Sequence, residues 1–149
     1  MITHVKGNLF ESDVDILVHG CNCFHVMGGG VARIVKELYP KAFSADKQFS
    51  FRGDIAKLGS FTSATVTHHY TEKELLIING YTQYEFGGGE DLFNYDAMKE
   101  LCCKLNGLFK DKSIAMPMIG SGLAGGDWKR IEKIINSEFK DKEVFVYYL

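Results

Sequence analysis

The 149-residue chain has the length and composition of one ordinary globular domain. Hydrophobic residues make up 46% of it and charged residues 24%, as in soluble globular proteins. Its 17 Lys and Arg residues are scattered and are outnumbered by 19 Asp and Glu residues, for a net charge of -2. This balance argues against the basic surface of a nucleic-acid-binding protein, so we expect one domain over residues 1–149 with no direct nucleic-acid footprint.

Short apolar runs and amphipathic segments alternate along the chain. The apolar runs predict strands at Ile2–Lys6, Val14–Val18, Phe61–Val66, Leu75–Asn79, Ser113–Met118 and Val144–Leu149. Apolar residues at helical spacing predict helices from Val31 to Leu38, from Tyr95 to Leu108, and from the N-cap Asp127 to Phe139. Pro40 is expected to end the first of these helices. Such alternation predicts a three-layer α/β/α fold with a mixed central sheet.

The cysteines and the apolar runs indicate a reducing compartment away from membranes. Cys21 and Cys23 stand one residue apart, and Cys102 and Cys103 are adjacent, so neither pair has the usual spacing of zinc ligands. We expect reduced thiols, no metal and no cofactor. No run approaches the ~20 apolar residues of a membrane helix, and the first ten residues lack the apolar stretch of a signal peptide. A cytoplasmic monomer is expected.

A glycine-rich loop follows the second expected strand. The segment His19-Gly20-Cys21-Asn22-Cys23 leads to Met27-Gly28-Gly29-Gly30-Val31-Ala32, where a helix is expected to begin. Glycines let a backbone approach a ligand closely, and a helix N-terminus offers free N–H groups to an anion. The pattern is neither a dinucleotide-binding fingerprint nor a Walker loop. A loop that only needs positive φ angles would use the same glycines.

A second glycine-rich segment, Met116–Gly126, follows the fifth expected strand. Its sequence, MPMIGSGLAGG, places a run of backbone amides before an expected helix, and such a nest suits a diphosphate without cationic side chains. A structural turn is an equal alternative for this segment alone. Because ligands of open α/β sheets bind at the carboxyl ends of the strands, we expect the two loops to form one site.

Four segments, in order and spacing, resemble the macro domain. They are VKGNLF at 5–10, VHGCNC with MGGGVA between 18 and 32, MPMIGSGLAGGDW at 116–128, and VYYL at 146–149. More narrowly, HGCNC, the glycine triplet and YPKA at 39–42 resemble the yeast ADP-ribose-1″-phosphate phosphatase. The MPxIGxGL loop is similar to that of its relative, the terminal ADP-ribose protein glycohydrolase. The resemblance covers nearly the whole chain and implies that the partner is ADP-ribose or ADP-ribose 1″-phosphate.

The resemblance also implies which residues bind the ligand. Asn8 stands where the family has an acidic residue that receives the adenine amino group, and its side-chain oxygen can still accept that bond. Leu9 would lie nearby, and Tyr147 would either line the adenine cleft or pack in the sheet. Asn22 would bond the distal ribose or, alternatively, brace its own loop. The diphosphate and distal ribose would lie among Cys21, Asn22, Met27, Gly28, Gly29, Gly30, Val31, Ile119, Gly120, Ser121, Gly122, Leu123, Ala124 and Gly125.

His19 is the candidate catalytic residue. Many macro domains have asparagine at this position, whereas the yeast phosphatase resembles this chain in having histidine. A neutral imidazole would accept a proton from water attacking the 1″-phosphate, or would attack phosphorus itself. A protonated imidazole would stabilise charge on the phosphoryl oxygens. The alternative is that His19 is a hydrogen-bonded structural residue at the end of an apolar strand.

The segment after the fourth expected strand argues for a phosphatase. In the terminal glycohydrolase a lysine near this segment forms a covalent intermediate with the ribose, and an aspartate in the nest assists it. Here the corresponding positions hold Asn79, Gly80 and Tyr81, and the nest position holds Ala124. A lysyl intermediate needs an amine, so we expect an enzyme that converts ADP-ribose 1″-phosphate to ADP-ribose and phosphate. The alternatives are an ADP-ribosyl hydrolase acting on a macromolecule and a binding module without turnover.

Overall fold

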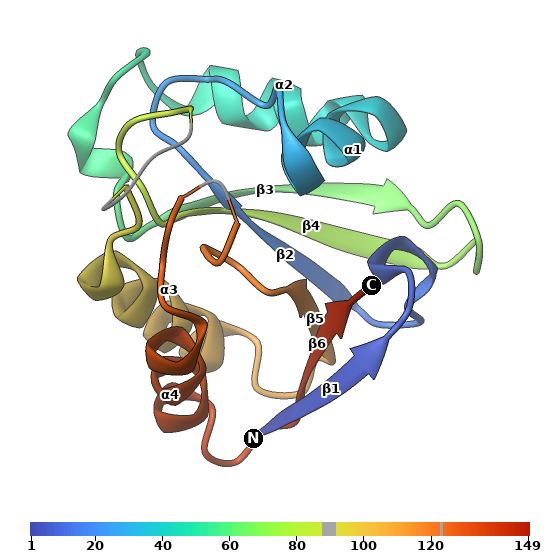
Figure 1. Cartoon of the computed structure of the whole chain (residues 1–149). Helices are drawn as coiled ribbons and strands as arrows, with labels where there is room; N and C mark the ends of the chain where they lie inside the picture. The colour runs from blue at the N-terminus through green and yellow to red at the C-terminus, as the bar shows by residue number, and fades with distance from the viewer. Residues whose placement is uncertain (88–91, 123) are drawn as a thin grey trace.

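The computed structural model describes residues 1–87, 92–122 and 124–149, and these form a sheet with helices on both faces (Figure 1). The strands are β1 (Ile2–Lys6), β2 (Ile16–Cys21), β3 (Phe61–Thr67), β4 (Glu74–Tyr81), β5 (Ile114–Pro117) and β6 (Val144–Tyr148). The α-helices are α1 (Gly30–Leu38), α2 (Pro40–Phe49), α3 (Tyr95–Leu108) and α4 (Trp128–Glu138), and the 3-10 helices are η1 (Leu9–Glu11) and η2 (Ile55–Lys57). No helix in these ranges is both long enough and apolar enough to cross a membrane.

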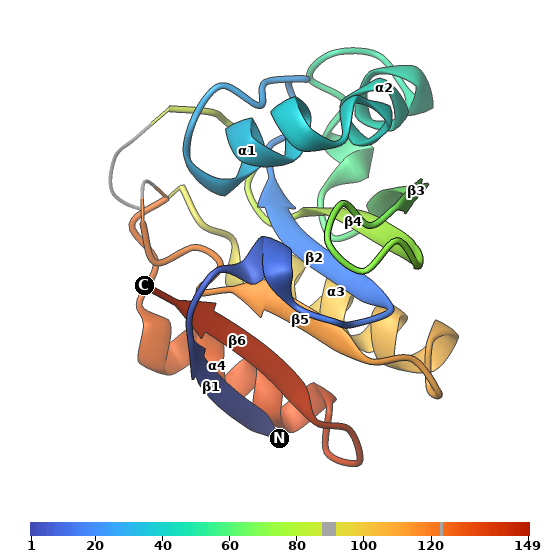
Figure 2. The ribbon, with the colours of Figure 1, turned by 90° about the vertical axis from the view of Figure 1, so that its right-hand side faces the viewer.

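The six strands form one mixed sheet in the order β1-β6-β5-β2-β4-β3. All neighbouring pairs are parallel except β3 and β4, which are antiparallel. The strand β2 therefore lies in the interior of the sheet between β5 and β4 (Figure 2). The predicted three-layer α/β/α fold with a mixed sheet is confirmed.

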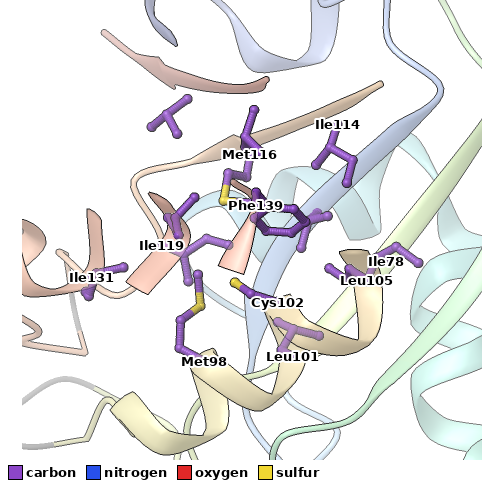
Figure 3. Close-up of a cluster of buried hydrophobic side chains, with 14 of the residues drawn as sticks. Ile78, Met98, Leu101, Cys102, Leu105, Ile114, Met116, Ile119, Ile131 and Phe139 are labelled. Atoms are coloured by element: carbon purple, nitrogen blue, oxygen red, sulfur yellow. The ribbon is translucent and has the colours of Figure 1, made fainter. Parts of the chain in front are cut away.

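Each face of the sheet buries its own apolar cluster. Adjacent residues of β2 point to opposite faces, so Leu17 packs with Val35 of α1 while Val18 packs with Leu101 of α3. The larger cluster lies under α3 and α4, where Met98, Leu101, Met116, Ile131 and Phe139 meet (Figure 3). Because strands buried on both faces read as continuous apolar runs, β2 and β4 lack an alternating polar pattern.

The strand β2 starts later and runs further than its apolar run predicts. The expected strand was Val14–Val18, whereas the structure has Ile16–Cys21. Asp15 lies just before it, and its carboxylate accepts hydrogen bonds from the backbone N–H and the hydroxyl of Ser113. His19 and Cys21 are consequently strand residues, with side chains on the same face, and do not belong to the glycine-rich loop.

Pro40 begins a helix rather than only ending one. The first helix, α1, ends at Leu38 before Pro40 as expected, but Pro40 is also the first residue of α2, which was not predicted and whose N-cap is Tyr39. Proline is tolerated at the first position of a helix because its missing N–H would have no partner there. By contrast, Asp127 is the N-cap of α4 as predicted, with its carboxylate accepting from the N–H of Lys129 at 3.0 Å.

Candidate ligand-binding cleft

A cleft of about 550 Å³ opens where the chain leaves the carboxyl ends of β2, β4 and β5. This volume is in the range of small-molecule sites. Ten of the predicted binding residues line it: Cys21, Asn22, Gly28, Gly29, Gly30, Val31, Ile119, Gly120, Gly122 and Ala124. The structure therefore brings the two glycine-rich segments together, while contact of these residues with a ligand stays a prediction. Leu123 lies outside the described residues.

One wall of the cleft is the N-terminus of α1. Its N-cap is Gly29, which has no side chain to bond the first N–H groups of the helix, and Gly30 adopts a φ of 59°. These amides are the groups that a helix leaves without intrahelical partners. A wall of this kind can hold a phosphate through backbone donors and the helix dipole.

The opposite wall is a backbone nest between β5 and α4. Gly120 and Gly125 have φ values of 81° and 71°, in the left-handed region that favours glycine. The nest closes on itself because the N–H of Gly126 donates to the carbonyl of Gly120 at 2.6 Å. Ser121 turns its hydroxyl to the carbonyl of Met118 at 2.8 Å, and neither Ser121 nor Gly125 lines the cleft.

The floor is the end of β2. A Cβ atom at Gly20 would come within 2.9 Å of Ile119 and 3.0 Å of Thr82, so glycine lets the end of β2 approach both of these side chains closely. The cleft also includes nine residues outside the predicted set: Gly20, Val26, Ala32, Thr82, Gln83, Phe86, Gly87, Pro117 and Met118. Thr82 and Gln83 follow β4 as the predicted loops follow β2 and β5, so the carboxyl-end argument applies to them as well.

Asn22 lines the cleft and also braces the loop that follows it. Its side-chain N–H₂ donates to the carbonyl of Val26 at 2.8 Å, and its side-chain oxygen accepts from the N–H of Phe24 at 2.9 Å. The loop-bracing alternative is therefore what this structure shows. An amide group has a second N–H and a second oxygen lone pair, so bonding to a ribose is compatible with these contacts.

The residues predicted for the adenine end lie beside the cleft rather than in its lining. The Asn8 side-chain oxygen accepts from the N–H of Phe10 at 3.0 Å and so caps η1. Leu9 belongs to a buried cluster against which Tyr147 and Val31 pack, and Val31 also lines the cleft. Met27 is buried below the loop and its side chain does not reach the lining.

His19 lies in the interior and does not line the cleft. Its Nε2 is 2.7 Å from the side-chain oxygen of Asn79. Burial lowers the pKa of His19 to about 4, against the smaller raising effects of the Asn79 hydrogen bond and the Asp46 charge. The imidazole is therefore neutral near pH 7. The imidazole has no exposed surface, so a substrate cannot contact it directly in this structure. Catalysis by His19 stays a prediction, and the buried position of the ring does not favour it.

The thiol of Cys21 stands between His19 and the cleft. It lines the cleft, and its sulfur is 3.7 Å from Nδ1 and 3.6 Å from Nε2 of His19. Burial raises the pKa of Cys21 well above its usual value, so the group is a thiol rather than a nucleophilic thiolate. Within the described ranges, no three His, Cys, Asp or Glu side chains are grouped to hold a metal ion.

The sequence matches the profile of the Macro domain family over residues 18–135. The chain belongs to the macro domain family. It is 33% identical to a 17.5 kDa protein of Enterobacteria phage T4 from the tk-vs intergenic region, with 98% of this chain and 95% of that protein aligned.

Two further relatives of this macro domain carry activities in their names. The ADP-ribose 1″-phosphate phosphatase of Saccharomyces cerevisiae is 29% identical, with 99% of this chain and 98% of that protein aligned. The DNA ADP-ribosyl glycohydrolase of Mycobacterium tuberculosis is also 29% identical over 99% of this chain, which spans only 42% of that relative's length. The solved macrodomain of Mycobacterium tuberculosis DarG is likewise 29% identical, with a TM-score of 0.78, covering 100% of this chain and 98% of that one.

Proposed function

We propose that this macro domain binds ADP-ribose and hydrolyses ADP-ribose 1″-phosphate to ADP-ribose and phosphate. The observation that carries the proposal is a cleft walled by two sets of backbone amides, those at the N-terminus of α1 and those of the nest residues Gly120, Gly122 and Ala124. Fold alone does not define chemistry. The reaction is supported instead by the full-length similarity to the yeast phosphatase.

The two walls are suited to the diphosphate of the ligand. None of the described lining residues is Lys or Arg, and the whole chain has a net charge of -2. The charge of the ligand is then balanced by partial charges on N–H groups of the helix and the nest. Such donors need no side-chain ordering when the ligand enters.

The hydrolysis needs a water that attacks phosphorus while the bond from phosphorus to the distal ribose oxygen breaks. The oxygen that leaves takes up a proton from water, and phosphate is the second product. Cys21, Asn22, Thr82 and Gln83 are the polar described side chains that line the cleft. These uncharged groups can orient the phosphate and the water, and the backbone amides can stabilise charge on the phosphoryl oxygens.

The first test measures phosphate release from ADP-ribose 1″-phosphate and calorimetric binding of ADP-ribose. The wild type is compared with Val31→Glu, which puts a carboxylate into the cleft lining at α1. Ile34→Glu is the matched control, because Ile34 is on the same helix but is exposed and outside the lining. We expect Val31→Glu to weaken ADP-ribose binding at least ten-fold, about 1.4 kcal/mol, and the control to bind like the wild type.

Two outcomes would contradict the proposal. Binding of ADP-ribose without phosphate release from the wild type would leave a binding module. Equal loss of binding in Val31→Glu and Ile34→Glu would mean that the cleft is not the site.

The similarity to the DNA ADP-ribosyl glycohydrolase favours a second candidate, removal of ADP-ribose from a macromolecule. Against it, the described lining contains no lysine that could form an intermediate with ribose, and the nest position in that lining is Ala124. Incubation with ADP-ribosylated DNA and ADP-ribosylated protein separates the candidates. Release of ADP-ribose from either substrate, without phosphate release from the 1″-phosphate, would replace the phosphatase.

A further inference from the structure

A rung of buried polar side chains crosses the sheet below the cleft. His19 of β2, Asn79 of β4 and Thr62 of β3 are register partners on three adjacent strands, and all three are buried. The side-chain oxygen of Asn79 is 2.7 Å from Nε2 of His19, and its N–H₂ donates to the Thr62 hydroxyl at 3.0 Å. The same N–H₂ donates to the carbonyl of Ala42 in α2 at 2.9 Å.

The rung continues into a buried ion pair. The Thr62 hydroxyl is 2.7 Å from the Tyr81 hydroxyl, which donates to the Asp46 carboxylate at 2.5 Å. Lys57 donates to the same carboxylate oxygen at 2.8 Å and to the Asp46 carbonyl at 3.0 Å. Lys57 and Asp46 are both fully buried, so each ion depends on the other and on these hydrogen bonds.

The ion pair fixes the direction of every hydrogen bond in the rung. The Asp46 carboxylate can only accept, so Tyr81 donates to it and its own oxygen accepts from Thr62. Thr62 has then used its proton and accepts from the N–H₂ of Asn79. With its N–H₂ committed to Thr62 and Ala42, Asn79 presents its oxygen to His19.

The same logic determines the tautomer of His19. Since the Asn79 oxygen is an acceptor, Nε2 of His19 carries the proton and Nδ1 keeps a lone pair. The sulfur of Cys21 lies 3.7 Å from Nδ1 and 3.6 Å from Nε2, so the thiol packs against the imidazole ring and is not aligned with one of its nitrogens.

We propose that His19 is a positioning residue, held as the Nε2–H tautomer by Asn79, and that its ring supports Cys21 at the floor of the cleft. Cys21 is the last residue of β2 and Asn22 follows it, so the rung sets where the loop that borders the cleft begins. The effect on ligand binding and hydrolysis rests on the proposed function, whereas the tautomer does not.

The test compares two replacements of His19 in the full chain. His19→Gln keeps an N–H donor at the place of Nε2 but has no group that can exchange a proton near pH 7. His19→Met has a similar length and no donor, so it leaves the buried oxygen of Asn79 without a partner. We expect His19→Gln to keep phosphate release and ADP-ribose affinity within about three-fold of the wild type, and His19→Met to lose about ten-fold in affinity.

Two results with these variants, and a third from the wild type, would overturn the proposal. If His19→Gln loses phosphate release and still binds ADP-ribose, His19 transfers protons in the reaction. If His19→Met matches the wild type in both assays, the rung does not position the cleft.

The third result needs no variant and no turnover. In ¹⁵N-edited NMR of the wild type, His19 is expected to carry its proton on Nε2, and a proton on Nδ1 would contradict the hydrogen-bond direction. If the wild type releases no phosphate, the phosphatase reading fails, while the NMR and ADP-ribose binding still decide the role of His19.

Discussion

At the scale of single residues, His19 shows how burial couples a titratable side chain to folding. The ring is fully buried with one hydrogen bond to an uncharged amide, so the protonated form loses its hydration and gains little in return. Its pKa falls from 6.5 to about 4 for this reason. The unfolded chain binds a proton near pH 6.5 that the folded protein does not bind until about pH 4.

This difference makes stability depend on pH in a defined window. Because the unfolded state binds more protons between pH 6.5 and about 4, His19 lowers the free energy of unfolding as pH falls through that range. The full effect is about 3 kcal/mol at 1.36 kcal/mol per pKa unit. Urea unfolding of the wild type and His19→Gln at several pH values measures it. Equal pH dependence in the two proteins would show that His19 titrates normally in the folded state.

At the scale of elements, the nest between β5 and α4 depends on one glycine more than on its neighbours. Gly120 has a φ of 81°, and the side chain of Phe93 occupies the place that a Cβ would need. Among the described residues, no atom lies within 4 Å of that place at Gly122, and its φ is not in the left-handed region. Both residues line the cleft, which makes them a matched pair.

Gly120→Ala is therefore expected to destabilise the fold and Gly122→Ala is not. The strained φ and the overpacking against Phe93 together should cost about 2–4 kcal/mol, whereas Gly122→Ala should stay within about 0.5 kcal/mol of the wild type. Thermal unfolding of the three proteins gives the comparison. A stable Gly120→Ala would mean that the loop relaxes, and its ADP-ribose affinity would then show whether the nest retains its shape.

Most element positions follow from local sequence, and the errors have local physical causes. The Asp127 cap and the apolar spacing of α3 and α4 are sufficient signals. The start of β2 was misplaced because Asp15 bonds Ser113, a residue distant in sequence. The helix α2 was missed because Pro40, which can end one helix, also begins another.

At the scale of the whole molecule, the location of the cleft was predictable and the rung beneath it was not. Loops after adjacent parallel strands meet at one edge of a sheet whatever their side chains are, and the glycines marked two of them. The rung joins α2, η2, β2, β3 and β4. No spacing rule links Asp46, Lys57 and Thr62 to His19, so only the folded chain shows that His19 is hydrogen-bonded within this rung.

The charge distribution leads to a last prediction, about ionic strength. Salt screens attraction between exposed charges beyond about 8 Å at physiological ionic strength, but the described cleft lining offers amides at contact distance and no Lys or Arg. ADP-ribose affinity should change by less than about three-fold between 50 and 500 mM NaCl, measured by calorimetry.

Single-stranded DNA, titrated in parallel, should not bind at physiological salt, because the chain has a net charge of -2 and lacks a cluster of basic residues. A steep loss of ADP-ribose affinity with salt would instead require a cationic side chain at the ligand. Strong, salt-sensitive DNA binding would favour a nucleic-acid substrate over the free 1″-phosphate, since phosphate contacts release counterions.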